Sequence, residues 1–294
     1  MRFLRLPLWR RAIRKATIRI IRVPYGLLVI CVLICPVLRA QETSDEIRHL
    51  ARNPVADAIK VPLAGSVNFD TGLYHRTSNS LQIQPVIPLQ LSEQWLLVPR
   101  IVATAITYIP DLTQNTGGRI GLGDTIATFF ITPARARKLI WGIGPSLLIP
   151  TATNGNLGGG KWDLGPSVVL LAEPKWGSAG VLVQNIWSLP GNSRRSSVNQ
   201  IQVETSLSYN LPHDWYLVTA PTLNSDWTQT TGQRWLVPVG GGAGRTFSIW
   251  QQAVDSNVTL YYNAIRPTGN LSPKWQMSLQ FTLIYPKERK STLN

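Results

Sequence analysis

The residues of this chain that could do chemistry are three histidines and one glycine-rich segment. His49, His75 and His213 lack the spacing of a metal-ligand set, so no metal site is predicted. Gly155 to Lys161 follows the outline of a phosphate-binding loop, G-x-x-x-x-G-K. However, Trp162 replaces the Ser or Thr that would hold magnesium, and an expected strand follows where a helix is needed. We therefore expect a flexible outer loop and no cofactor.

A hydrolytic site is the alternative that would make the chain an enzyme. His75 lies close in sequence to Ser78 and Ser80, and a lipid-modifying enzyme needs such groups together with a polar orienting residue. This segment is expected to be a loop, which disfavours catalysis. Both cysteines, Cys31 and Cys35, lie in the first forty residues, so the rest of the chain has no disulfide, thiolate zinc site or cysteine nucleophile.

The polar residues are placed by a two-residue alternation. Between Trp275 and Tyr285 every odd position is large and apolar, while the even positions from 276 to 282 are Gln, Ser, Gln and Thr. The segment from Ile201 to Tyr209 alternates in the same way. This period is typical of a strand with one apolar and one polar face, in a soluble sandwich as well as in a membrane barrel.

The tryptophans favour the membrane barrel. Apart from Trp9, they fall at the start or end of an expected strand, as is needed at the two water–lipid interfaces. We predict an all-β protein, a transmembrane antiparallel up-and-down β-barrel. Its interface girdle would consist of Trp95, Trp141, Trp162, Trp176, Trp187, Trp215, Trp227, Trp235, Trp250 and Trp275.

Twelve strands are expected, an even number as in bacterial single-chain barrels. Mostly tight connections alternate with mostly longer, polar ones, which predicts short periplasmic turns and longer outer loops. Pro85, Pro99, Pro145, Pro166, Pro221 and Pro238 fall inside expected strands, so those strands either carry bulges or have other boundaries. The expected strands are 63–70, 80–89, 94–108, 121–132, 139–150, 161–173, 177–188, 198–210, 213–227, 233–248, 254–266 and 273–285.

The segments outside the barrel differ in composition. Residues 1–40 hold nine Arg and Lys and no acidic residue, followed by the apolar run 26–38, which is typical of a cleaved signal peptide. An uncleaved anchor is the alternative. Residues 41–62 are expected to form a short helical tether or a plug, residues 63–287 the barrel, and residues 288–294 a charged tail. Because most of the net charge of +14 lies in the leader, the charge does not indicate a nucleic-acid partner.

The inward face of such a barrel would be polar and nearly uncharged. Arginines at the loop margins could bind lipopolysaccharide phosphates or remain solvated. Outer-membrane lipid, lipopolysaccharide, the barrel-assembly machinery and a small organic solute are the expected partners. The candidate lumen-lining residues are Gln82, Gln84, Gln200, Gln202, Glu204, Asn257, Thr259 and Asn263.

Several longer stretches resemble the bacterial "MetA-pathway of phenol degradation" family. The resemblance implies an outer-membrane barrel that carries small, aromatic or hydrophobic compounds, with strand prolines as a family feature and no catalytic residues. The aromatic residue that often ends such barrels is here Tyr285, followed by Pro286 and the charged tail. The similar stretches are 53–57, 83–88, 121–124, 141–153, 158–167, 209–212, 234–244 and 261–267, within about 53–287.

The leading hypothesis is therefore an outer-membrane channel for passive uptake of small organic compounds in a Gram-negative bacterium. A surface barrel that acts through its outer loops without transport is the second hypothesis. A lipid-modifying enzyme is the third.

Overall fold

The computed structural model describes residues 50, 53, 55, 58–135, 139–190, 195–249, 252–267 and 272–286. Among these residues, no helix is both long and apolar enough to cross a membrane. The predicted signal peptide, most of the predicted segment 41–62, and the tail 288–294 lie outside the described residues.

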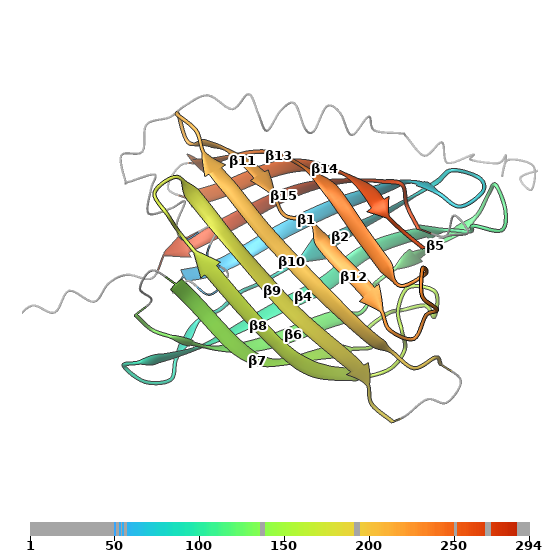
Figure 1. Ribbon diagram of the computed structural model, residues 1–294, viewed down its shortest axis with the longest axis horizontal. Coiled ribbons are helices and arrows are strands. Elements are labelled where there is room, and N and C mark those ends of the chain that lie inside the picture. Colours follow the sequence, from blue (N-terminus) through green and yellow to red (C-terminus); the bar gives the residue numbers. More distant parts are fainter. Residues whose placement is uncertain are drawn as a thin grey trace, which may run out of the picture. The chain divides into compact units, whose positions relative to one another are not determined.

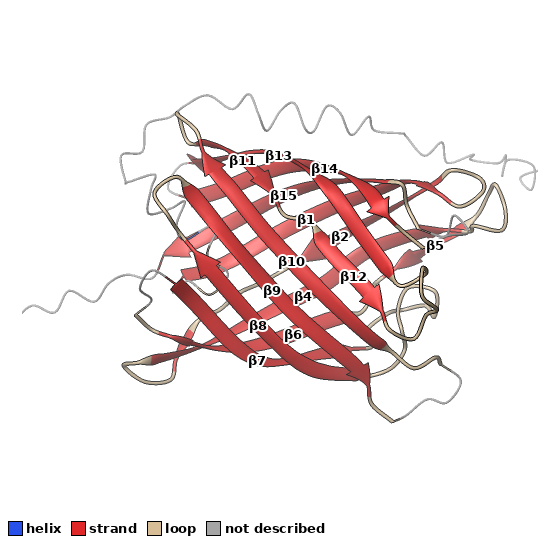
Figure 2. Cartoon of the chain, viewed as in Figure 1, coloured by secondary structure: helices blue, strands red, loops and turns tan. Residues whose placement is uncertain are grey.

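The described residues form one antiparallel sheet that closes on itself (Figures 1 and 2). Neighbours around the ring follow chain order, and pairing of the first strand with the last completes the closure. The strands are β1 (Ala58–Thr71), β2 (Arg76–Ile83), β3 (Leu89–Gln90), β4 (Trp95–Pro110), β5 (Gly118–Gly121), β6 (Thr125–Pro133), β7 (Leu139–Ile149), β8 (Asp163–Ala172), β9 (Gly177–Ser188), β10 (Asn199–Asn210), β11 (Trp215–Thr219), β12 (Thr222–Asp226), β13 (Trp235–Ile249), β14 (Gln252–Ile265) and β15 (Trp275–Pro286).

The wall of the barrel has twelve strand positions, which we call staves. Three of them are each built from two short strands. β2 and β3 both pair with β4, β5 and β6 both pair with β4, and β11 and β12 both lie between β10 and β13. The prediction of a twelve-stranded antiparallel barrel is thereby confirmed. Alternation along the chain predicts it because a closed ring gives every strand one inward and one outward face.

The first strand begins earlier than predicted. Residues 58–62 were expected to end a helical segment, but they form the start of β1 and pair with residues 282–286 of β15. This pairing supplies hydrogen-bond partners to the end of β15, which would otherwise be a free edge. The first stave is thus as long as its neighbours.

The strand prolines sit where the ladders are interrupted. Pro145 of β7 lies opposite Pro166 of β8. The missing pairs fall on the other sides of these strands, between Thr128 and Ile131 in the β6–β7 ladder and between Leu164 and Ser167 in the β8–β9 ladder. Proline cannot donate a backbone hydrogen bond, so these gaps are its direct consequence.

Pro99 lies within β4, opposite Phe129 of β6, and the other three prolines are accommodated in two further ways. Pro238 follows a register shift at Val237 in β13. Pro85 lies between β2 and β3, and Pro221 lies between β11 and β12. Apart from the earlier starts of β1 and β2, the strands lie close to their predicted positions, while the sequence did not indicate which staves would be split.

The two ends of the barrel differ in the length of their connections. Among the described residues, we call the end with 91–94, 134–135, 173–176 and 211–214 the turn end. The opposite, loop end carries 72–75, 111–117, 150–162, 189–190, 195–198, 227–234, 266–267 and 272–274. The predicted alternation is present, and the short connection 72–75 is an exception at the loop end.

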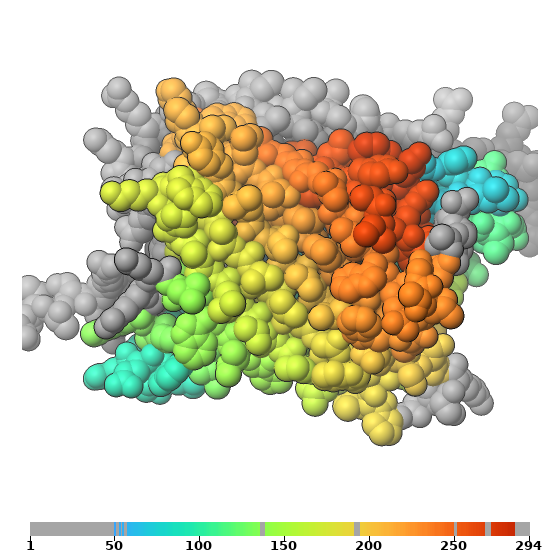
Figure 3. Space-filling model, viewed as in Figure 1, coloured from blue at the N-terminus to red at the C-terminus, as the bar shows by residue number. Residues whose placement is uncertain are grey.

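The outer face of the barrel is apolar. In β8, Leu164, Val168 and Leu170 are exposed while Ser167 and Val169 are buried, so exposure alternates with the pleat. The outer surface that this alternation builds is continuous in the view of Figure 3. An exposed apolar wall of this extent is typical of a protein surrounded by lipid.

The tryptophans form two groups, one at each end. At the turn end Trp95 contacts Trp141 edge-on with ring centroids 5.9 Å apart, and Trp176 stacks on Tyr209 at 6.4 Å. Trp215 belongs to the same end. At the loop end Trp227 contacts Trp235 at 5.9 Å, and Trp275 contacts Tyr262 at 5.0 Å. Trp162 and Trp187 also lie at the loop end, and Trp250 lies outside the described residues.

Candidate functional site

The barrel encloses a cavity of about 530 Å³. It is lined by residues from β1, β2, β4, β6, β8, β9, β10, β12, β13, β14 and β15, so it belongs to the barrel interior as a whole. Among the predicted lumen residues, those that line the cavity are Gln82, Gln84, Gln202, Glu204, Asn257 and Thr259.

Two predicted lumen residues lie elsewhere. Gln200 is exposed at the loop end, opposite Asp226 of β12. Asn263 is buried, and its amide nitrogen donates to the carbonyl oxygen of Pro273 at 2.8 Å. Both lie near the loop end of their strands and outside the cavity, because alternation predicts a side and carries no information about depth.

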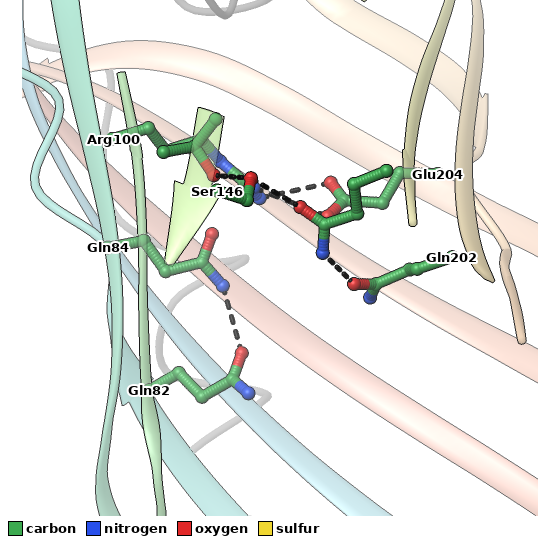
Figure 4. Close-up of polar contacts among 8 residues, drawn as sticks. Gln82, Gln84, Arg100, Ser146, Gln202 and Glu204 are labelled. Carbon is green, nitrogen blue, oxygen red and sulfur yellow. Dashed lines mark hydrogen bonds and ion pairs between the residues drawn. The ribbon is translucent and has the colours of Figure 1, made fainter. Parts of the chain in front are cut away.

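A chain of hydrogen bonds crosses the inner wall formed by β6 to β10. The hydroxyls of Thr128 and Ser146 are 2.6 Å apart, and Ser146 is also bonded to the hydroxyl of Ser167. Ser146 donates to the amide oxygen of Gln184 at 3.2 Å, and the amide nitrogen of Gln184 donates to Gln202 (Figure 4). These side chains carry no charge and satisfy one another, and Gln184 and Gln202 are the members of the chain that line the cavity.

One ion pair spans the interior. The guanidinium of Arg100 on β4 holds both carboxylate oxygens of Glu204 on β10, with nitrogen–oxygen distances of 3.3 and 3.0 Å (Figure 4). Between these strands lie β6, β7, β8 and β9 on one side, and β2, β1, β15, β14, β13 and β12 on the other. The pair therefore reaches across the barrel between strands that are nearly opposite.

Sequence reasoning identified Glu204 but missed Arg100. Inward Leu96, Val98 and Val102 are as apolar as their outward neighbours in β4, so the alternation that marks the lumen elsewhere is absent there. The signal that could have identified Arg100 is its charge, which stands out among the apolar residues of this strand. Its partner lies 104 residues away and becomes apparent only when the ring is closed.

The turn end of the interior is packed with apolar side chains. Val98 and Phe130 are completely buried, and Leu171 is nearly so. Val55, which precedes β1 in the chain, is 4% exposed and belongs to this same cluster. The remaining members of the cluster are Val86, Leu96, Ile140, Val169 and Leu182.

Lys60 ties the segment ahead of β1 to the cavity. Its side chain is buried, lines the cavity and donates to the backbone carbonyl of Asn53. The side-chain oxygen of Asn53 in turn accepts from the backbone N–H of Val55 at 3.0 Å. Residues 53 and 55 thus lie against the interior of the barrel.

The loop-end arginines are bonded to backbone carbonyls of their own or neighbouring loops. Arg76 donates to the carbonyls of Gln114 and Gly117 at 2.9 and 2.8 Å, and Arg195 donates to the carbonyl of Gly155 at 2.8 Å. Arg234 and Arg266 likewise donate to backbone carbonyls. These bonds show that the arginines stabilise the loops. This role does not depend on whether they also bind lipopolysaccharide phosphates.

One loop-end carboxylate is held by its neighbour in the same loop. Asp111 accepts from both the hydroxyl and the backbone N–H of Thr113, and these bonds lower the pKa of Asp111. Hydrogen bonds to the charged form have this effect because protonation would break them.

The residues suggested for hydrolysis are not assembled. His75 is bonded to Asp70 at the loop end, whereas Ser80 bonds Ser66 at 2.8 Å and Ser78 accepts from Asn68. No cluster of three metal-binding side chains is found in the described part of the chain.

Comparisons with known proteins give a fold and no family. No family model matches the chain, and no curated protein sequence matches it. Its structure is similar to an outer membrane channel from Pseudomonas putida F1, with 13% identity and a TM-score of 0.57 over 78% of this chain and 96% of that one. This similarity supports the barrel fold alone.

Two further similarities are looser. The toluene transporter TodX of Pseudomonas putida has 9% identity and a TM-score of 0.38, over 81% of this chain and 93% of its own. Outer membrane phospholipase A of Escherichia coli has 11% identity and a TM-score of 0.40, over 81% and 97%. At these scores neither adds to the assignment.

Proposed function

We propose that this protein is an outer-membrane channel for the passive passage of small organic compounds. The observation that carries the proposal is the combination of an apolar outer wall with an interior cavity of about 530 Å³ rich in neutral polar side chains. A barrel that served only as a surface scaffold would have no need of such a space, because small barrels fill their interiors with side chains.

The lining of the cavity favours a particular class of solute. Ser66, Gln82, Gln276 and Gln280 offer neutral hydrogen-bonding groups, whereas the β4, β6 and β9 side offers apolar groups such as Val102, Ile126 and Leu182. A small molecule with an apolar body and a hydroxyl or carbonyl group matches both sides. Aromatic alcohols and phenols have this character, in agreement with the resemblance to the phenol-degradation family.

The same proposal places the protein in its membrane. The two tryptophan groups would lie at the two headgroup levels, with lipid and lipopolysaccharide around the apolar wall between them. The loop end would face outward and the turn end the periplasm. Residues 1–40 would serve as a cleaved signal for export, and the barrel-assembly machinery would insert the chain.

Uptake into proteoliposomes tests the proposal. Vesicles that contain the mature protein should admit benzyl alcohol and other phenol-sized neutral solutes faster than empty vesicles. Replacement of Asn257 in the cavity by Trp should reduce the rate, because the indole occupies space that the solute needs. Leu260→Trp on the exposed outer face of the same strand is the matched control and should transport normally.

The opposite result is equally clear. A folded wild-type barrel that gives no more uptake than empty vesicles would contradict the channel and favour the surface barrel. Rapid uptake that Asn257→Trp leaves unchanged would place the pathway outside this cavity.

A further inference from the structure

We infer that the Arg100–Glu204 pair is a crossbar that limits the width of the channel while adding no net charge to it. The inference rests on the proposed function, since it assigns a role within that channel. It concerns two residues joined through space across the interior, 104 positions apart in the chain.

The crossbar reaches across the cavity and narrows it. On the side of β6 to β9 the cavity is lined by Ile126, Val181 and Leu182, and the polar side chains of Thr128, Ser146 and Ser167 in that wall are each at most 1% exposed. On the opposite side the cavity is lined by Ser66, Gln82, Asn257, Gln276 and Gln280. The pair therefore lies between two parts of the lining and restricts the space between them.

The accessibility of the pair fits a group that borders a pathway. The side chains of Arg100 and Glu204 are 12% and 27% exposed, and both line the cavity. A pair that served only to stabilise packing would be sealed from solvent, whereas these two face the space through which a solute would move. Their two-point contact fixes both side chains against the wall.

Charge balance gives the pair its effect on selectivity. The described residues that line the cavity include three charged side chains, and one of them, Lys60, is bound to the Asn53 carbonyl. Arg100 and Glu204 neutralise each other, so the pair adds no net charge to the middle of the lumen, whereas the hydrogen bond to a neutral carbonyl does not offset the charge of Lys60. An unpaired charge there would concentrate counter-ions, because a narrow low-dielectric space focuses its field.

Planar bilayer recordings across a salt gradient test the inference on the mature protein. Arg100→Gln leaves Glu204 unpaired and should shift the reversal potential toward cation selectivity. Glu204→Gln leaves Arg100 unpaired and should shift it toward anions. Each change in the cation-to-anion permeability ratio should be at least about fivefold, since such clefts enrich counter-ions by about tenfold or more.

Double variants separate the effect of the pair's charges from its effect on the width of the channel. Arg100→Gln with Glu204→Gln should conduct more than wild type without a change in selectivity, because the crossbar is gone and neither position carries a charge. The exchange Arg100→Glu with Glu204→Arg should restore wild-type conductance and selectivity. Because both double variants avoid an unpaired charge in the interior, they provide a test even if the single variants do not fold.

Two exposed charges outside the cavity serve as controls for the charge changes. Arg119→Gln at the loop end and Glu93→Gln at the turn end remove the same charges from exposed positions and should shift selectivity far less. Folding of each variant is verified by heat-modifiable gel mobility. Selectivity and conductance that stay at wild-type values in the folded single and double variants would overturn the crossbar.

The readouts also separate this inference from the proposed function. Ion currents do not depend on an organic substrate. Altered selectivity in a protein that fails to take up benzyl alcohol would contradict the proposed function and leave the crossbar intact. Normal uptake with unaltered ion selectivity would do the reverse.

Discussion

Placing an arginine on the outer face of β8 would test whether that face contacts lipid. Val168 is 41% exposed and points outward. It lies between Leu164, which is paired with Trp187 at the loop end, and Leu170, which is paired with Trp141 at the turn end. With a strand rise of about 3.3 Å and a tilt of about 40°, these two levels lie on the order of 10 and 5 Å away along the barrel axis.

The cost of Val168→Arg follows from that depth. An outward-facing arginine costs about 2–4 kcal/mol near the middle of the bilayer and about 0–1 kcal/mol at its surface. Because Val168 lies between the middle and the nearer tryptophan level, we expect about 2 kcal/mol, a roughly 30-fold fall in the ratio of folded to unfolded protein. In water the same change at an exposed position would cost no more than about 0.5 kcal/mol.

Urea titration of the protein in lipid vesicles measures this difference, with tryptophan fluorescence and gel mobility as independent probes. Ile120→Arg is the control, because Ile120 is 73% exposed in β5 at the loop end and should be near the membrane surface. Equal costs below about 0.5 kcal/mol at both positions would refute the assignment of the outer wall to lipid.

Three further variants test the interior and the loops. Phe130→Ala should cost about 3–5 kcal/mol in urea titration because it empties a completely buried site, whereas Phe129→Ala on the outward face should cost much less; equal costs would mean that the inward cluster is not packed as described. Arg76→Gln should speed thermolysin cleavage within 111–117 by roughly tenfold, because it removes the donors to that loop, and unchanged cleavage would assign the loop's order to other contacts. Lys60→Met should raise trypsin cleavage ahead of residue 53 by roughly fivefold through loss of about 1 kcal/mol of hydrogen bonding, and equal rates would show that this bond does not hold the segment.

The fold could be predicted from the sequence because each strand of a closed barrel has one lipid-facing and one inward side, and its residues alternate accordingly between apolar and polar. Alternation from 201 to 209 and from 275 to 285 corresponds to β10 and β15 almost residue for residue. The same reasoning could not foresee the start of β1 at Ala58, because residues 58–62 join the strand through pairing with the far end of the chain.

The site was readable only in part. Gln82 and Gln202 face the cavity as alternation predicts, whereas Gln200 and Asn263 lie near the loop end. Depth along a strand depends on tilt and stagger around the whole ring, which no single strand encodes. The contact of Arg100 with Glu204 depends on closure in the same way.

The seam between the first and last strands has a consequence for biogenesis. β1 and β15 are aligned from Ala58–Pro286 to Phe69–Trp275, so the ring closes only when two segments that are far apart in the chain meet. A partly assembled barrel in which they have not met has two edges of unpaired peptide groups, which invite association with other chains. A variant truncated before Trp275 would lack β15 and keep both edges open.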